Sequence, residues 1–218
     1  MNIILIGSAG SGKGTQARQL VKKFGMAYFS TGDQLRFLTR KNTPLGREVA
    51  KKISAGELIS DEIMEKILAD FIDKNQNQSI IFDGFPRVLS QAEILKKRLA
   101  NIGGVNLVIF LNISKQEAVK RLASRVICRQ CGAVYNKNTN PPRQANICDR
   151  CGGKLYQRED ETPQAIGKRL ENFYEKTEPV IEFYRHQGVL EEVDGEKPIK
   201  AISAELIKII TLLDTEPN

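Results

Sequence analysis

Residues 2–15 read NIILIGSAGSGKGT, and this stretch decides the class of fold. Its first part, Asn2 to Ile6, is a short apolar run that predicts a β-strand. Its second part, Gly7 to Thr15, has glycine at the first and sixth positions of a loop and Lys13 directly after it, which is the spacing of a phosphate loop. The sequence therefore predicts a strand, a loop whose backbone N–H groups converge on one anion, and a helix that starts near Lys13.

One position of this loop departs from the common pattern. Gly14 follows the lysine, where many phosphate loops carry a serine or threonine whose hydroxyl binds Mg²⁺ directly. We therefore expect Mg²⁺ to be held here mainly through water. The alternative is a glycine-rich turn without a ligand, but it does not explain why the strand, the lysine and the helix occur together.

Apolar or β-rich runs recur along the chain, separated by stretches of helical period, and this alternation predicts an α/β fold with a parallel sheet. The sheet is expected to have about five strands, at Asn2–Ile6, Ala27–Ser30, Ser79–Asp83, Val105–Leu111 and Val189–Val193. Proline at the first helical position and capping boxes mark helix starts. These are Thr43-Pro44, Thr162-Pro163, Ser90 with Glu93, and Ser114 with Glu117.

The composition limits the class of protein. With 218 residues and 41% hydrophobic content, the chain can bury one core with a small excursion but is short for two full domains. A net charge of +7 favours polyanionic partners without identifying them. The apolar start is too short for a membrane span and does not resemble a signal peptide, so we expect a cytoplasmic protein without a membrane partner. Because His186 is the only histidine, a histidine general base is not expected.

From about Val126 to Glu161 the apolar period gives way to cysteines, glycines and prolines, which indicates an inserted module. Two CxxC pairs separated by sixteen residues lie in it, and this spacing fits a four-cysteine zinc site. The ligands would be Cys128, Cys131, Cys148 and Cys151. Four thiolates leave no open position on the metal, so we expect a structural Zn²⁺. Two disulfides are the alternative, which a reducing compartment disfavours.

The segment Asp83-Gly84-Phe85-Pro86-Arg87 follows the third expected strand, at the edge where open α/β sheets bind ligands. Asp83 can face the phosphate loop there and order water around Mg²⁺, while the planar fork of Arg87 suits a phosphate. A plain strand-ending turn would have the same appearance.

Arginines flank the inserted module. Arg121 and Arg125 are four residues apart on the helix that enters it, and Arg158 lies where the chain leaves it. Movement of the module could bring these guanidinium groups over bound phosphates, where phosphoryl transfer needs charge stabilisation and alignment more than a base. Each of them taken alone could be an ordinary solvated arginine.

Together these motifs resemble the adenylate kinase family of nucleoside monophosphate kinases, in its long-lid, zinc-containing form, from Ile3 to about Lys197. The phosphate loop, the segment from Ser30 to Arg36 and the DGFPR segment carry the likeness. The resemblance implies a P-loop, doubly wound core of residues 1–29, 60–125 and 162–218. It also implies a helical AMP-binding arm at residues 30–59 and a zinc-binding lid at residues 126–161, named below the arm and the lid.

The resemblance further implies the role of individual residues. The expected ATP-binding residues are Gly10, Ser11, Gly12, Lys13, Gly14, Thr15, Arg125, Val134, Tyr135 and Lys197. The expected AMP-binding residues are Thr31, Arg36, Glu57, Leu58, Ile59, Gly84, Phe85, Pro86, Arg87, Gln91, Arg158 and Arg169. The residues expected to act on the transferred group are Lys13, Arg87, Arg121, Arg125, Arg158 and Arg169, with Asp83 serving Mg²⁺ through water.

Four positions differ from the pattern of the family. They are Ala9 in the phosphate loop, where proline is frequent, Ser124 and Val126 beside Arg125, where glycine and a second arginine are common, and Glu161, which replaces an aspartate. Ala9 should loosen the turn slightly in the unfolded chain without removing a phosphate donor. The other three bear on the strength of the hinge and on lid closure.

The implied reaction is reversible transfer of the ATP γ-phosphoryl group to AMP, giving two ADP, by a protein expected to be a monomer that does not bind nucleic acid. The nearest alternative is a UMP/CMP-type kinase. Thr31 distinguishes the two, since the resemblance associates threonine here with adenine and alanine with pyrimidines. A zinc-ribbon nucleic-acid-binding ATPase is an alternative of another class, suggested by the charge and the cysteine pairs, although few aromatics are present there for base stacking.

Overall fold

The computed structural model describes residues 1–158 and 160–215, so Glu159 of the expected lid and residues 216–218 of the expected core lie outside it. Within the described residues, five parallel strands form the central sheet in the order β2-β3-β1-β4-β8. They are β1 (Asn2–Ile6), β2 (Ala27–Ser30), β3 (Ile80–Asp83), β4 (Leu107–Asn112) and β8 (Leu190–Asp194). The predicted runs agree with these strands to within two residues, and the predicted α/β fold class is confirmed.

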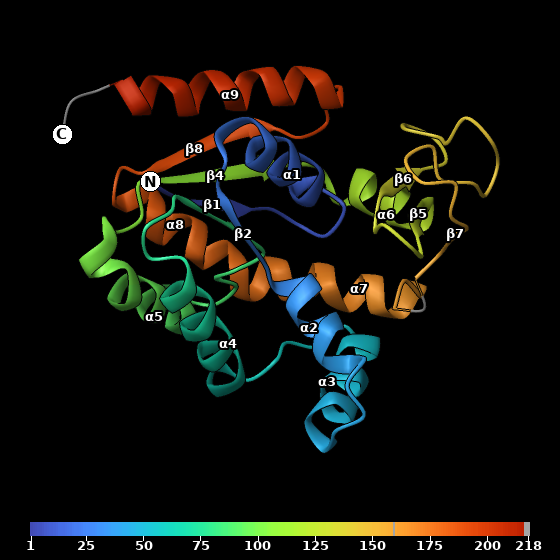
Figure 1. Cartoon of the computed structure of the whole chain (residues 1–218), viewed down its shortest axis with the longest axis horizontal. Coiled ribbons are helices and arrows are strands. Elements are labelled where there is room, and N and C mark those ends of the chain that lie inside the picture. The colour runs from blue at the N-terminus through green and yellow to red at the C-terminus, as the bar shows by residue number, and fades with distance from the viewer. Residues whose placement is uncertain (159, 216–218) are drawn as a thin grey trace.

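Helices cover both faces of this sheet (Figure 1). Those that follow or flank its strands are α1 (Lys13–Phe24), α4 (Asp61–Lys74), α5 (Leu89–Leu99), α6 (Lys115–Ala123), α7 (Pro163–Asn172), α8 (Glu178–His186) and α9 (Ile199–Thr215). Two short turns accompany them, the 3-10 turn η1 (Ala100–Ile102) and the π-helical turn η2 (Phe173–Thr177), which joins α7 to α8. The arm contains α2 (Thr31–Thr39) and α3 (Pro44–Ala55).

The central strand β1 shows how the two faces are filled. Successive side chains of a strand point to opposite faces. Ile3 and Leu5 accordingly pack with residues of α1 and α9, and Ile4 and Ile6 pack with residues of α4, α5 and α8. Figure 1 shows α9 on one side of the sheet and α5 and α8 on the other. All four side chains are at most 2% exposed, so β1 and the loop that follows it are firmly held.

The predicted helix starts are confirmed at the two proline positions. Thr43 and Thr162 each accept a hydrogen bond from a backbone N–H of the first turn, at 3.0 and 3.2 Å. The prediction for Ser90 was wrong, because α5 begins one residue earlier and the Ser90 hydroxyl donates to the carboxylate of Asp61 at 2.5 Å. Ser90 therefore lies inside the first turn and not at the N-cap, which is Val88, and its hydroxyl is left to donate a charge-assisted hydrogen bond to α4.

Ser114 caps α6 as predicted, since its hydroxyl accepts from the backbone N–H of Glu117 at 3.2 Å. The second hydrogen bond of a capping box, from the backbone N–H of Ser114 to the carboxylate of Glu117, does not form. The carboxylate of Glu117 instead accepts from Arg121 at 2.7 Å, one helical turn further on.

A second, smaller sheet lies in the lid and was not predicted. Its antiparallel strands are β5 (Arg125–Cys128), β6 (Val134–Asn136) and β7 (Leu155–Tyr156), in the order β6-β5-β7. Figure 1 shows it beside α6, apart from the central sheet. β6 and β7 contain three and two residues, too few to display a period of two, and β5 runs directly into the first cysteine pair of a segment without apolar periodicity.

Within the described residues, no helix combines the length and the apolar character that a membrane crossing requires.

Candidate functional site

The phosphate loop lies between β1 and α1, at the carboxyl edge of the central sheet. Its neighbours β3 and β4 pair with β1 on opposite sides, so the strand order reverses at this point, which is where open α/β sheets place their ligands. Gly10 has φ +90°, and a Cβ there would come to 3.0 Å from the carbonyl oxygen of Ala118. Glycine is therefore required at this turn for both its backbone conformation and the close approach of α6.

Lys13 is folded back onto the loop that it follows. Its Nζ donates to the carbonyl oxygens of Gly7 and Ser8 at 2.7 and 2.8 Å. Burial is the main cause that lowers the pKa of Lys13 to about 8, while the charge of Asp83 acts in the opposite direction. An ammonium group held in such a place is ready to exchange backbone acceptors for a phosphate, whose charge would offset the cost of burial.

Asp83 and Arg87 lie beside the loop because β3 is the neighbour of β1. Asp83 pairs in register with Leu5, two residues before the loop begins, and its Oδ2 accepts from the hydroxyl of Tyr28 at 2.8 Å. Arg87 donates through Nε to the carbonyl oxygen of Gly84 at 2.8 Å. Burial and the neighbouring Arg169 lower the pKa of Arg87 to about 10, with Asp83 opposing them.

Gln91 holds the segment that carries Arg87. Its Oε1 accepts from the backbone N–H of Arg87 at 2.9 Å, and its Nε2 donates to Asp61 at the start of α4, also at 2.9 Å. The side chain is buried, at 3% exposure, yet it lines the same cavity as Arg87. The amide is thus positioned by the fold before any ligand binds.

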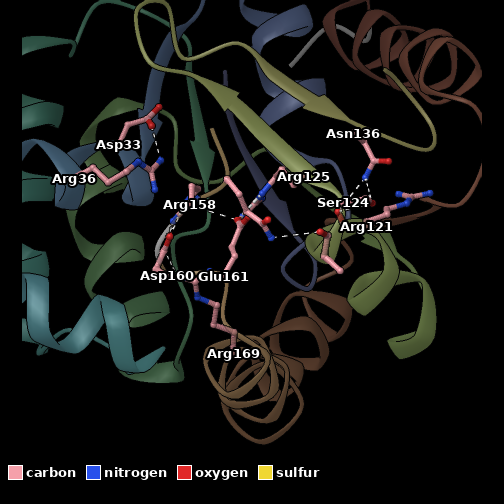
Figure 2. A network of polar contacts seen from close by, with 12 residues as sticks. Asp33, Arg36, Arg121, Ser124, Arg125, Asn136, Arg158, Asp160, Glu161 and Arg169 are labelled. Carbon is pink, nitrogen blue, oxygen red and sulfur yellow. Dashed lines mark hydrogen bonds and ion pairs between the residues drawn. The ribbon is translucent and has the colours of Figure 1, made fainter. Parts of the chain in front are cut away.

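A network of arginines and carboxylates lies where the end of the lid meets Arg125 and Arg169 of α7 (Figure 2). Arg158 and Arg169 both bind Asp160, and Arg125 binds Glu161. Arg158 also lies near Glu161, with its Nε 3.8 Å from Oε1. Figure 2 shows the three guanidinium groups converging on the two acids. The described structure therefore gathers Arg125, Arg158 and Arg169 at one place. The prediction that Arg121 and Arg125 share a helix was wrong, because α6 ends at Ala123 and Arg125 begins β5.

The charges of this network influence one another. Burial would raise the pKa of Asp160, but hydrogen bonds and charges from Arg158 and Arg169 outweigh it and hold the pKa at about 2. Burial, followed by repulsion from Arg158 and Arg169, lowers the pKa of Arg125 to about 9. Guanidinium groups in such mutual repulsion favour any additional anion that can bind among them.

Lys13, Asp83, Arg87, Gln91 and the three arginines of the network border one cavity of about 670 Å³. Every predicted nucleotide-binding or catalytic residue lines it except one, Phe85. The ring of Phe85 is 1% exposed and packs in the core against Phe29, with ring centroids 6.0 Å apart. The side chain of Phe85 therefore faces the core, where an aromatic ring next to a buried strand is better placed than in a polar cleft, and the expected AMP contact at this position stays a prediction.

Three of the expected nucleotide contacts have partners of their own. The Thr31 hydroxyl donates to the carbonyl oxygen of Gly84 at 2.9 Å, and Lys197 binds Glu205 on α9 at the same distance. Tyr135 lines the cavity, but its hydroxyl lies 3.5 Å from Sγ of Cys148 and accepts from the backbone N–H of Asp149 at 2.9 Å. These residues stay predicted contacts, and for Tyr135 the hydroxyl is already engaged inside the lid.

The four cysteines meet at the end of the lid sheet. Their sulfur atoms all lie within 4.8 Å of one another, with Cys128 and Cys151 at 3.4 Å and Cys131 and Cys148 at 3.5 Å. The edge of a tetrahedral zinc–thiolate site is about 3.8 Å, from a Zn–S distance of about 2.3 Å. A disulfide would need about 2.05 Å. The arrangement fits a metal ion bound by four thiolates, and all four cysteines are free.

The surroundings of Gly14 bear on the binding of Mg²⁺. A Cβ at Gly14 would come to 3.2 Å from Oδ2 of Asp83, so the carboxylate lies directly against the first turn of α1. Because Gly14 provides no hydroxyl ligand, Asp83 suits an ion that keeps most of its water shell, and Mg²⁺ keeps its water readily. The residues present thus fit an ion held through water by Asp83.

Three of the four departures from the family pattern, Ser124, Val126 and Glu161, lie at the two chain segments where the lid begins and ends. The Ser124 hydroxyl donates to the carbonyl oxygen of Lys120 at 2.7 Å and accepts from Nδ2 of Asn136 at 3.0 Å. The same amide donates to the carbonyl oxygen of Arg121 at 3.0 Å, so Asn136 joins β6 to the end of α6. Ala9 packs against the apolar cluster between α6 and α7. Sequence reasoning had not identified Asn136.

Two further polar residues of the site were also missed. Asp160 was overlooked because acidic residues near arginines are common on surfaces, and only the fold shows that two guanidinium groups share it. The sequence pattern places Tyr28 within a strand and assigns it no other role. The period of two in a strand offered a signal. Tyr28 lies two residues before Ser30 and therefore on the same face of β2, and Ser30 pairs with Asp83 at the end of β3.

Comparison with known proteins agrees with this geometry. The chain matches the family model described as Adenylate kinase over residues 5–189. An adenylate kinase of Bacillus licheniformis is 40% identical over 212 residues, which cover 96% of this chain and 98% of that relative. Adenylate kinases of Archaeoglobus fulgidus and Staphylococcus aureus are 40% and 39% identical over 212 residues, covering 96% of this chain and 98% and 99% of theirs. With a phosphate loop, clustered arginines and a match over nearly its whole length, the chain belongs to the adenylate kinase family.

Proposed function

We propose that the protein catalyses the reversible transfer of the γ-phosphoryl group from MgATP to AMP, giving two ADP. The observation that carries this proposal is the convergence of cationic side chains from the core, the arm and the lid on one cavity. Among them are Lys13, Arg36, Arg87, Arg125, Arg158 and Arg169. Two nucleotides meeting through their phosphates form a line of negative charge that such a set can neutralise along its length.

The chemistry follows from what phosphoryl transfer requires. The transferred group passes through a loose transition state whose charge is spread over its equatorial oxygens, so positioning and charge stabilisation replace covalent help from the protein. The backbone N–H groups of the loop and Lys13 would hold the donor phosphates. Arg87, with the residues after β3, would hold the acceptor phosphate. Arg125, Arg158 and Arg169 would exchange their carboxylate partners for the oxygens of the transferred group.

We further infer that the arm, residues 30–59, and the lid, residues 126–161, are the moving parts of the enzyme. Support comes from the cavity, which is bordered by Arg36 and Glu57 of the arm and by Cys128 and Arg158 of the lid. Closing both segments over the phosphates would exclude water, which would otherwise compete with AMP for the γ-phosphoryl group.

Two metal ions have separate roles in this proposal. Zn²⁺ bound by the four lid cysteines would stabilise a segment whose own apolar cluster is small, and it would take no part in the reaction. Mg²⁺ would arrive with ATP and neutralise phosphate charge, with Asp83 orienting its water shell. A reducing compartment such as the cytoplasm would keep the thiolates available to zinc.

The site supports activity of a monomer. Core, arm and lid residues of one chain border the entire proposed phosphate region, so a second copy need not contribute to it. We expect the activity per chain to be independent of protein concentration.

The proposal is tested by the product formed with each acceptor. Purified protein is incubated with MgATP and either AMP, UMP or CMP, and the nucleotides are separated by chromatography. We expect ADP to appear as the sole product with AMP, at a rate far above that with UMP or CMP. Equal or better rates with the pyrimidines would establish a UMP/CMP-type kinase, and ATP hydrolysis stimulated by nucleic acid but indifferent to AMP would reject a monophosphate kinase altogether.

A further inference from the structure

Tyr28 lies beside the phosphate loop without a role in the reaction described so far. In the parallel pairing of β2 with β3, Tyr28 is opposite Ile81 and Ser30 is opposite Asp83. Because alternate side chains share a face, Tyr28 and Asp83 are diagonal neighbours on the same face of the sheet. The Tyr28 hydroxyl spans that diagonal and donates to Oδ2 of Asp83 at 2.8 Å.

The ring of Tyr28 is held in place by apolar packing. It packs against the apolar cluster between the sheet and the helices α1 and α9, which includes Ile81 and Leu20. A tyrosine has only two side-chain torsions, so a packed ring carries its hydroxyl to a well-defined place at small entropic cost. The carboxylate that accepts from it is therefore restricted in its own rotation.

The space next to Gly14 makes this contact relevant to the metal. In many phosphate loops the residue after the lysine provides a hydroxyl that acts on Mg²⁺ together with an acidic residue of the neighbouring strand. Here that residue has no side chain, and a Cβ placed on it would lie 3.2 Å from Asp83 Oδ2 and 3.7 Å from the Tyr28 hydroxyl. A hydroxyl is thus present beside the acid, but it comes from β2 instead of the loop.

We propose that Tyr28 is a positioning residue for Mg²⁺, which holds Asp83 through Oδ2 so that Oδ1 faces the water shell of the ion. The proposal rests on the proposed function, in which Asp83 serves Mg²⁺ through water. Among the described residues no hydrogen bond engages Oδ1, so that oxygen is available. Tyr28 itself touches neither the ion nor the nucleotides.

The experiment measures binding, so that it does not depend on turnover. A bisubstrate inhibitor, two adenosines joined by five phosphates, is titrated calorimetrically into the protein with and without Mg²⁺. The ratio of the two dissociation constants is the Mg²⁺ gain. In Tyr28→Phe we expect this gain to fall about three- to tenfold, because a hydrogen bond to a charged group is lost, while the affinity without Mg²⁺ stays near that of the wild type.

Tyr184→Phe is the matched control. Tyr184 is buried, whereas Tyr28 is half-buried, and both rings pack against the sheet. The Tyr184 hydroxyl has no hydrogen-bond partner among the described residues. Its removal should leave the Mg²⁺ gain unchanged. If Tyr184→Phe lowers the gain as much as Tyr28→Phe does, the effect is a general consequence of altering the core and the proposal is overturned.

A double-mutant cycle separates positioning from structural support. In the Asp83→Asn background, adding Tyr28→Phe should lower the Mg²⁺ gain no further, because the residue through which Tyr28 acts is already changed. A second reduction of the same size would show that Tyr28 acts independently of Asp83 and would overturn the proposal, as would an unaltered gain in the single variant. Failure of the wild type to bind the inhibitor or to form ADP would instead count against the proposed function itself.

Discussion

Arg125 directly precedes the lid and Glu161 is its last residue, 36 positions later, and their side chains form an ion pair with Nε 2.6 Å from Oε1. The carboxylate is fully buried, whereas about a fifth of the arginine side chain is exposed, at 21%. The pair joins the start of β5 to the residue just before the cap of α7. One of the positions that differ from the family pattern thus holds together the two chain segments on which the lid stands.

Loss of the Glu161 carboxylate charge should lower the stability of the fold. In Glu161→Gln the buried side chain keeps its size, but Arg125 loses its counter-charge, and we expect stability to fall by about 1–3 kcal/mol. For a protein of this length the melting temperature would drop by about 3–10 °C, measurable by calorimetry. Glu182→Gln is the control, since its exposed ion pair with Arg185 should contribute little. Equal melting temperatures for Glu161→Gln and the wild type would show that the pair is energetically neutral.

Arg158 should matter for catalysis through its planar fork. Arg158→Lys keeps the positive charge but cannot form two parallel hydrogen bonds, so we expect kcat/KM for ADP formation to fall roughly 100- to 1000-fold with an intact fold. The rate is followed by coupled spectrophotometry and the fold by circular dichroism. Arg143→Lys, at an exposed lid position, should retain wild-type activity. A loss below threefold in Arg158→Lys would remove Arg158 from the proposed machinery.

The rate should depend on pH through Lys13. Its pKa in the ligand-free protein is lowered to about 8, mainly by burial, so the ammonium that the donor phosphates need is present below this pH and is lost above it. We expect kcat/KM for MgATP, which reports the free enzyme, to be flat up to about pH 7.5 and to decline above pH 8. Arg125, with a pKa of about 9, would steepen the decline at higher pH. A profile that stays flat to pH 9.5 would contradict this assignment.

Removal of zinc should affect stability more than chemistry. Cys128→Ser removes one of four thiolates, and we expect the zinc content to fall and the melting temperature to drop by roughly 5–15 °C. At low temperature, where the lid remains folded, turnover should stay within a few-fold of the wild type, because no cysteine is assigned to the phosphates. Metal content is measured by mass spectrometry on the same samples. Parallel loss of turnover and stability at every temperature would point instead to an ion that participates in the reaction.

Much of the fold could be predicted from local patterns. The strand and glycine loop of residues 2–15, the parallel sheet and the proline-marked helix starts were all foreseen, since each depends on residues close in sequence. The failures have a common origin. Ser90 was predicted to cap a helix, but α5 begins at Leu89 and the Ser90 hydroxyl donates to Asp61, 29 residues away. The lid strands were missed because two of them are too short to show a period and all three lie in the cysteine- and glycine-rich segment.

The candidate site divides in the same way. Lys13, Asp83, Arg87 and the four cysteines follow from motifs whose spacing reflects one ligand or one metal, and their positions in the structure agree with that reading. Phe85, in contrast, belongs to the same motif as Arg87 but faces the core. A motif fixes the backbone path, and the competition between burial and solvation then decides where each side chain points.

The amino-acid sequence by itself determined that a phosphate cradle follows a buried strand, that arginines flank an inserted segment, and that four cysteines can hold a metal. Only the tertiary structure decided which charges meet. Asp160 lies between two guanidinium groups and Tyr28 reaches Asp83 because strand register and chain closure bring distant residues within hydrogen-bond distance. Hydrogen bonds and ion pairs act over a few ångströms, and the spacing of residues along a chain does not specify those distances until the core has packed.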